Sequence, residues 1–306
     1  MRHGLRLMLT ASCLAAAGCS AIPAAAAGTQ RAAARRVPAP LYGVTIDEVT
    51  NLGPIVASLA HLPRRPTARI AFDPGMQPAD YRQAVDAIGK VAAIMAEPVD
   101  SSEVTGYTTA QYVARFRDYL AAFGSRIAIW EVGNEVNGNW LGPASTVRAD
   151  IVGAYDVVSA AGARTALTLT YEPGCGGGPS YDMWTWAARN IPAAMKEGLD
   201  YVLVSYYEED CDNYRPTQQE WDTVFKRLHA MFPHARLGFG EVGTNPGDSV
   251  AYKLAYLNRY YRLRIDVPGY IGGYFWWYYA EDMVPYQRNP LWQALAAAFR
   301  PHRLPC

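Results

Sequence analysis

The chain alternates between two apolar patterns eight times, and this alternation limits the fold more than any other feature. Short apolar runs, as in buried strands, are followed by longer segments with apolar residues at three- and four-residue spacing, as in helices. The strand-like runs are residues 41–47, 67–73, 91–97, 126–135, 164–172, 200–207, 236–242 and 271–278. The helical segments are residues 49–60, 78–89, 108–123, 146–161, 181–197, 217–231, 249–264 and 290–299.

The number and order of these units predict the fold class. Eight strand–helix units in about 260 residues are the count and the size of a (β/α)8 barrel, also called a TIM barrel. An open doubly wound sheet is the alternative, but its Gly-rich phosphate fingerprint is missing from "YGVTIDEVTNLG" at the first strand. We therefore predict an α/β fold with a single (β/α)8 barrel over residues 39–306.

The first 27 residues have the pattern of an export signal. Arginines lie at the start of the apolar run "LRLMLTASCLAAAGC", and small residues near Ala27 provide a cleavage site. We predict a signal peptide over residues 1–27 and a disordered lead-in over residues 28–38. An alternative interpretation is a lipoprotein signal that ends before Cys19 and leaves a lipid anchor there. The run is shorter than the ~20 residues of a membrane span, so we expect a secreted or periplasmic protein without one.

The charge balance argues against two classes of partner. Lys and Arg together number 28, as do Asp and Glu, so the formal net charge is zero. Neither nucleic acid nor an anionic membrane surface is therefore indicated as a partner. The 21 Tyr and 8 Trp residues mainly supply a core, but flat aromatic faces at loop ends also suit sugar rings. We expect the protein to act as a monomer.

The cysteines predict one disulfide and no metal site. An exported protein meets oxidising conditions, in which cysteines pair. Cys175 and Cys211 each follow a predicted strand, so we predict that they form a disulfide. Cys13 and Cys19 fall in the signal region, and Cys306 is left unpaired. No CxxC or HExxH spacing is present, so we expect no metal and no other cofactor.

Acidic side chains follow almost every predicted strand. In a (β/α)8 barrel these positions meet at the C-terminal face, where active sites lie. Most strand-end acids are explained by helix capping or by solvation at the rim. Glu135 and Glu241 differ, because no helix begins directly behind either and both are surrounded by glycines. No histidine follows a strand, so chemistry here must come from carboxylates, tyrosines and Arg. Two carboxylates that flank a bond are what glycoside cleavage needs.

Three segments carry a family resemblance. "WEVGNE" over residues 130–135, "GFGEVG" over residues 238–243 and "GGYFWWYYAED" over residues 272–282 resemble the clan A glycoside hydrolases. These are retaining (β/α)8 enzymes with catalytic glutamates on strands four and seven. The resemblance implies an exported retaining O-glycosyl hydrolase that cleaves a β-type bond in an oligo- or polysaccharide.

The resemblance also assigns roles to residues. Glu135 corresponds to the general acid/base and Glu241 to the nucleophile, with carboxyl groups about 5–5.5 Å apart. Asn134 corresponds to the residue that hydrogen-bonds the sugar 2-hydroxyl. Trp277 corresponds to the stacking platform in the cleavage subsite, and Trp276 is the alternative because the strand register is open.

Two further positions match the family pattern, one of them incompletely. Arg69 corresponds to an arginine near the nucleophile, and it also has Glu131 within the same barrel as a candidate ion-pair partner. Tyr207 matches the tyrosine of a His-x-Tyr pattern that bonds the nucleophile. Ser205 stands where relatives often have the histidine, which leaves the donors around the cleavage subsite open.

Loop residues complete the predicted substrate site. Trp140 begins a loop that we expect to shape the leaving-group side, and Glu208 is either a ligand for sugar hydroxyls or part of a solvated loop. A carbohydrate-binding barrel without catalysis is the alternative function.

Overall fold

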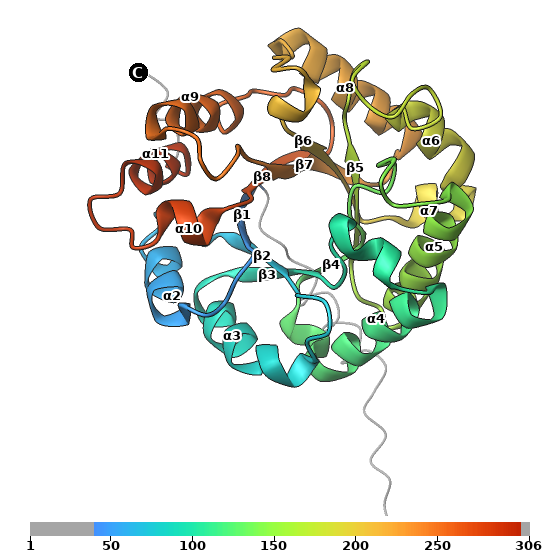
Figure 1. Cartoon of the computed structure of the whole chain (residues 1–306), viewed down its shortest axis with the longest axis horizontal. Helices are drawn as coiled ribbons and strands as arrows, with labels where there is room; N and C mark the ends of the chain where they lie inside the picture. The colour runs from blue at the N-terminus through green and yellow to red at the C-terminus, as the bar shows by residue number, and fades with distance from the viewer. Residues whose placement is uncertain (1–39, 301–306) are drawn as a thin grey trace, which may run out of the picture. The chain divides into compact units, whose positions relative to one another are not determined.

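The computed structural model describes residues 40–300, which form a closed barrel of eight strands (Figure 1). The strands are β1 (Leu41–Ile46), β2 (Thr67–Ala71), β3 (Ala93–Glu97), β4 (Ile129–Gly133), β5 (Thr165–Thr170), β6 (Tyr201–Tyr206), β7 (Arg236–Val242) and β8 (Tyr270–Trp276). Each pairs in parallel with the next, and β8 pairs in parallel with β1. This closure confirms the predicted (β/α)8 barrel. The predicted signal peptide, the lead-in and Cys306 lie outside the described residues.

Helices surround the barrel on its outer side (Figure 1). They are α2 (Leu52–Ala60), α3 (Pro78–Val91), α4 (Thr109–Phe123), α5 (Ala144–Ala160), α6 (Met183–Asn190), α7 (Ala193–Gly198), α8 (Gln218–Met231), α9 (Val250–Tyr260), α10 (Tyr279–Met283) and α11 (Pro290–Ala298). Short 3-10 turns are η1 (Ser101–Gly106), η2 (Gly124–Arg126) and η3 (Glu209–Cys211). Between residues 40 and 300 no helix is both long enough and apolar enough to cross a membrane.

The prediction of one helix over residues 181–197 is wrong, because two helices occupy this range. Helix α6 ends at Asn190, and α7 begins after its N-cap, Pro192. A proline cannot donate the helical hydrogen bond and disfavours helical geometry in the residue before it. Ile191 is accordingly extended, with ψ of 118°. The short helix α10 was also absent from the sequence pattern.

The inside of the barrel is apolar toward the start of the strands and polar toward their ends. The apolar part is a small buried cluster of Leu41, Met95, Ile129, Ala166, Tyr201, Leu203, Ile271 and Phe275. Outward-facing residues form a second, larger apolar cluster with the helices. The buried polar residues of the strands include Thr45, Arg69, Glu97, Glu131, Thr168, Ser205 and Glu241. Buried polar groups of this kind need hydrogen bonds, and near the strand ends most of these side chains bond one another, while Oε2 of Glu97 has no partner among the described residues.

A β-bulge in β7 directs Glu241 into the barrel. Val204 of β6 pairs with Phe239 and Ser205 pairs with Glu241, so Gly240 is an extra residue without a partner. An inserted residue reverses the alternation of side chains, as bulges near active sites often do. A Cβ at Gly240 would lie 2.8 Å from Thr168 Oγ1, so only glycine fits there.

Replacing Gly238 should test how tightly β7 and β8 pack. A Cβ at this position would lie 2.3 Å from the carbonyl oxygen of Gly272, a backbone atom that cannot rotate away. We expect Gly238→Ala to destabilise the barrel by about 1–3 kcal/mol, as overpacking does. Thermal unfolding followed by circular dichroism should show a clearly lower Tm.

Gly247→Ala is the matched control, because no atom lies within 4 Å of the added Cβ. Equal Tm values for the two variants would contradict the packing described for β7 and β8.

Candidate active site

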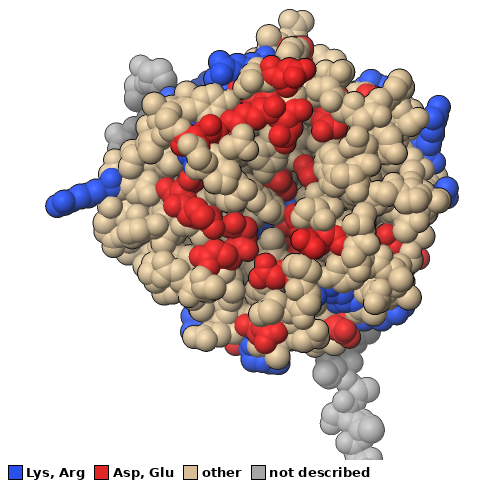
Figure 2. All heavy atoms as spheres, in the orientation of Figure 1, with Lys and Arg blue, Asp and Glu red and all other residues tan. Residues whose placement is uncertain are grey.

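Acidic side chains gather around the hollow at the barrel's C-terminal face. Figure 2 shows this concentration around the centre, with most Lys and Arg side chains at the periphery. The acids that follow the strands include Asp47, Asp73, Asp100, Glu135, Glu172, Asp210 and Glu281, and Glu241 lies within the end of β7. The mouth is therefore electronegative, and the contacts below it determine which carboxyl groups hold a proton.

Arg69 lies at the centre of this face, fully buried and bound to three carboxyl groups. Its Nε donates to Glu131 on β4 at 2.7 Å, and Nη2 donates to Glu97 on β3 at 2.7 Å. Its Nη1 donates to Glu241 on β7 at 2.6 Å. Both relationships expected for Arg69, with Glu131 and with Glu241, are thus present together. Charge-assisted bonds of this length fix the direction of each partner.

One guanidinium cannot neutralise three carboxylates, and Glu97 is the partner with the weakest set of bonds. Burial raises the pKa of Glu97 well above its usual range, although Arg69 opposes the shift. Oε2 of Glu97 has no hydrogen-bond partner among the described residues, so this carboxyl group is the least well satisfied of the three. Thr168 donates to the remaining oxygen of Glu131, so that carboxyl group is held from two sides.

Glu241 is surrounded by donors. Besides Arg69, the hydroxyl of Tyr207 donates to its Oε1 at 2.7 Å, and Nδ2 of Asn134 donates to its Oε2 at 3.2 Å. Burial raises the pKa of Glu241, while Arg69 and Tyr207 oppose that rise. Three donors to one carboxyl group favour its ionised form. The structure thus brings three predicted residues, Arg69, Asn134 and Tyr207, to the same carboxylate.

Glu135 lies just beyond β4 in a contrasting environment. Two serine hydroxyls donate to it, Ser101 to Oε2 at 2.8 Å and Ser205 to Oε1 at 2.5 Å. Its side chain is only 9% exposed. Burial, and then the negative charge of Glu241, raise its pKa to about 8. Glu135 is therefore protonated at neutral pH, and a carboxyl group in this state can donate a proton.

The backbone at Glu135 is held in an uncommon conformation. Its φ of 47° lies in the left-handed region, which disfavours residues other than glycine. The amide of Val136 bonds Thr168, and the side chain of Asn137 bonds both backbone groups of Thr170. These bonds to β5 hold the turn that places Glu135 in the mouth.

Trp277 and Trp276 lie on opposite sides of the strand. Trp277 is half-buried, and the guanidinium carbon of Arg69 lies 5.3 Å from its ring centroid. Trp276 is fully buried on the helix side, with its indole N–H donating to Asp282 at 2.9 Å. Of the two candidate platforms, only Trp277 borders the site.

A pocket of about 360 Å³ adjoins Glu135. Its lining residues are Glu135, Trp140, Thr170, Tyr171, Glu172, Tyr207 and Asp210. Trp140 is one of these lining residues and is 42% exposed.

Glu208 does not reach the pocket. The side chain is fully buried, Arg215 donates to Oε2 at 2.8 Å, and Arg259 and Tyr260 donate to Oε1. Both oxygens are thus used inside the protein, which leaves none for a sugar. The neighbouring acid Asp210 lines the pocket instead.

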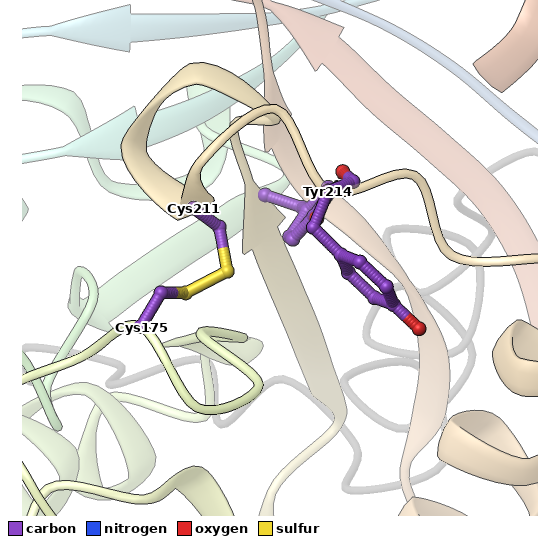
Figure 3. The surroundings of a disulfide bond; sticks show 4 residues. Cys175, Cys211 and Tyr214 are labelled. Carbon is purple, nitrogen blue, oxygen red and sulfur yellow. A yellow bond between two sulfur atoms is a disulfide. The ribbon is translucent and has the colours of Figure 1, made fainter.

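The predicted disulfide between Cys175 and Cys211 is present (Figure 3). It joins the loop after β5 to the loop after β6, with the two Cα atoms 5.1 Å apart. Within residues 40–300, no group of three or more His, Cys, Asp or Glu side chains is arranged to hold a metal ion.

Sequence reasoning missed several residues of the site. Ser101 lies on η1, and no motif marks it. Ser205 was noticed only as a departure from a histidine, although its strand-end position was a usable signal. Glu172 and Asp210 follow the fifth and sixth strands, but the sequence alone does not distinguish them from acids that cap helices or lie at the rim.

Solved structures of other proteins share this barrel fold. No protein-family model and no curated protein matches the chain. Among solved structures, a GH10 xylanase from Bispora sp MEY-1 with xylobiose is 14% identical to this chain, with a TM-score of 0.55. The match covers 80% of this chain and 86% of that chain. The catalytic domain of the major endoglucanase from Xanthomonas campestris pv. campestris is also 14% identical, with a TM-score of 0.52. That match covers 86% of this chain and 96% of the other.

A third solved structure shares the barrel with a longer protein. An FMN-binding β-glucuronidase from Facaelibacterium prausnitzii L2-6 is 15% identical with a TM-score of 0.52. The match covers 78% of this chain but only 37% of that one. At these identities the likeness establishes the barrel fold and leaves the chemistry to the residues of the site.

The raised pKa of Glu135 should make stability depend on pH. The folded protein holds this proton up to about pH 8, whereas the ordinary value is 4.5. Between these values the folded state binds more protons than the unfolded state, so stability falls as pH rises. Burial acts likewise on Asp47, whose pKa is raised to about 7. We expect Tm to fall between pH 5 and pH 8.5, measured by calorimetry.

Glu135→Gln removes one of these protons and should flatten the dependence. Its Tm should fall less steeply than that of the wild type over the same range. Parallel curves for the two proteins would contradict the protonation assigned to Glu135.

Proposed function

We propose that this protein is an exported retaining glycoside hydrolase that cleaves a β-type bond of an oligo- or polysaccharide. One observation carries the proposal: two buried carboxyl groups lie in the same mouth with opposite environments. Glu135 is kept protonated by burial, while Glu241 has three donors that favour its anion. A proton donor with a carboxylate nucleophile is the pair that double displacement requires.

In the first half of the reaction, Glu241 attacks the anomeric carbon and forms a glycosyl ester. The bond from that carbon to the leaving oxygen breaks, and Glu135 transfers its proton to this oxygen. The leaving sugar departs with a free hydroxyl group. Asn134 is suited to bond the 2-hydroxyl, because its side chain lies against Glu241. Trp277 supplies an aromatic face beside the same carboxylate.

In the second half, Glu135 acts as a base. Having lost its proton, it accepts one from water, and the resulting oxygen attacks the anomeric carbon. The ester bond breaks, Glu241 leaves as a carboxylate, and Glu135 is protonated again. Arg69 and Tyr207 stabilise the carboxylate before the first step and after the second.

Two further observations support this proposal. The solved structures with the same barrel include proteins named as a xylanase, an endoglucanase and a β-glucuronidase. Export is supported by the disulfide between Cys175 and Cys211, since such bonds persist in oxidising compartments. The carbohydrate substrate itself is to be identified by a screen of polysaccharides and aryl glycosides.

Replacing either glutamate should remove most activity. We expect Glu135→Gln and Glu241→Gln to lower kcat on an aryl or polymeric glycoside by on the order of a thousandfold. Azide should partly rescue the Glu135→Ala and Glu241→Ala variants by entering the space of the missing carboxylate. Released sugar is measured as reducing ends or as the aryl alcohol.

Glu103→Gln is the control, because it removes a carboxylate from η1 without touching either glutamate. Near-wild-type turnover by Glu135→Gln or Glu241→Gln would reject the proposal. Saturable glycan binding by the wild type without any cleavage would instead favour a carbohydrate-binding barrel.

The serine donors should set the alkaline limit of activity. Ser101 and Ser205 both donate to Glu135 and lower its pKa, against the rise that burial causes. A hydrogen bond to a charged group contributes about 1.5–3 kcal/mol, so losing one should raise the pKa of Glu135 by about one unit. Ser205→Ala should therefore move the alkaline limb of kcat/KM to higher pH and lower kcat.

Ser205→Thr should restore the wild-type profile, because it keeps the hydroxyl. Ser102→Ala is the control for the η1 position, since that hydroxyl bonds Asp100 instead of Glu135. An unmoved alkaline limb in both Ser101→Ala and Ser205→Ala would show that these serines do not influence the proton of Glu135.

A further inference from the structure

The pocket beside Glu135 has no role in the steps above beyond receiving the leaving group. Glu135 lines it and Glu241 does not. In the proposed reaction the proton donor faces the leaving oxygen, so the pocket lies on the leaving-group side. Its volume of about 360 Å³ is within the range of ligand pockets. What it binds is therefore the sugar released first.

An unpartnered hydroxyl indicates that the pocket binds a polar ligand. Thr170 is only 5% exposed and lines the pocket, yet its hydroxyl has no hydrogen-bond partner among residues 40–300. Its backbone N–H and C=O are both held by Asn137, so the position of the residue is fixed. The hydroxyl oxygen is not among the enclosed polar atoms, so it opens onto the pocket, where a sugar hydroxyl can bond it.

The charges of the pocket narrow the class of sugar. Its lining contains Glu172 and Asp210 besides Glu135, and no Lys, Arg or His. Within the described part of the chain, neither Glu172 nor Asp210 has an ion-pair or hydrogen-bond partner. Burial, and then the nearby charge of Asp210, raise the pKa of Glu172, so the two groups lie close enough to interact. A cationic group on the ligand would neutralise this pair of carboxyl groups.

The two loops that carry these carboxyl groups are connected to each other. A Cβ at Gly176 would lie 2.4 Å from Oε2 of Glu172, so the loop after β5 closes tightly over that side chain. Cys175 of this loop is bonded to Cys211, the residue directly after Asp210 (Figure 3). The cross-link therefore joins the loop that carries Glu172 to the turn that carries Asp210.

We propose that the leaving-group pocket binds an amino sugar with a free ammonium group, placed between Glu172 and Asp210. The sugar ring would pack on the aromatic faces of Trp140, Tyr171 and Tyr207, and its hydroxyl groups would bond Thr170. An ammonium beside an aromatic face gains cation–π attraction in addition to charge pairing. Acidic sugars are repelled, and neutral sugars leave the charge pair without compensation. This inference rests on the proposed glycosidase function for the identity of the leaving side.

Binding to an inactive variant tests the inference separately from catalysis. Glu241→Gln is a suitable background, because Glu241 does not line the pocket. Titration calorimetry would compare β-1,4-linked glucosamine tetrasaccharide with its N-acetylated counterpart and with cellotetraose at pH 6. We expect the glucosamine tetrasaccharide to bind at least about tenfold tighter than either, and its affinity to fall with added salt.

In this background, we expect Glu172→Gln and Asp210→Asn each to weaken the binding of the glucosamine tetrasaccharide about tenfold. The affinity for cellotetraose should stay nearly unchanged, so most of the preference is lost. Asp212→Asn is the matched control, with the same charge change two residues away and outside the pocket. Asn tolerates the left-handed conformation of this residue, whose φ is 52°.

Equal affinity for the three tetrasaccharides, binding of none of them, or a preference unchanged by both pocket variants would overturn the inference. A different result would overturn the proposed function: the wild-type protein would bind the preferred tetrasaccharide but release no reducing ends.

Discussion

The ion cluster around Arg69 is the interaction on which the site depends. One guanidinium from β2 joins carboxyl groups from β3, β4 and β7, so strands that are distant in sequence share one buried charge. Removing the arginine would leave three buried acids without a cation, which costs far more than losing one surface pair. Because each bond is short and directional, the cluster also fixes the carboxyl group of Glu241. The proposed nucleophile is thus bonded from the strands around it.

The Arg69 cluster also explains why the surroundings of Glu241 and Glu135 differ. Glu241 accepts hydrogen bonds from the Arg69 guanidinium and from two neutral donors. Within the described part of the chain, Glu135 accepts hydrogen bonds only from two serine hydroxyls and lies near the negative charge of Glu241. The negative charge that Arg69 helps to hold on one residue therefore raises the pKa of the other. Two identical side chains thus have different surroundings, and environments of this kind are the general way in which one site provides both an acid and a base.

The fold and part of the site were predictable from sequence, for reasons that particular residues make clear. Alternating strand and helix periods specify the barrel, and glycines around Glu135 and Glu241 mark acids that do not cap helices. A period of two residues does not show where a bulge falls, which is why the choice between Trp276 and Trp277 stayed open until the structure placed them. The pairing of Glu208 with Arg215 and Arg259, and the donors Ser101 and Ser205, depend on contacts between distant segments that no local pattern encodes.

The stereochemistry of the first product tests the central claim most directly. Proton NMR of the wild-type protein acting on its preferred β-glycoside would follow the anomeric proton in the first minutes, before mutarotation. Two successive displacements at Glu241 predict that the β-anomer appears first and the α-anomer only later. An α-anomer formed first would show a single displacement by water, and Glu241 would then not be the nucleophile.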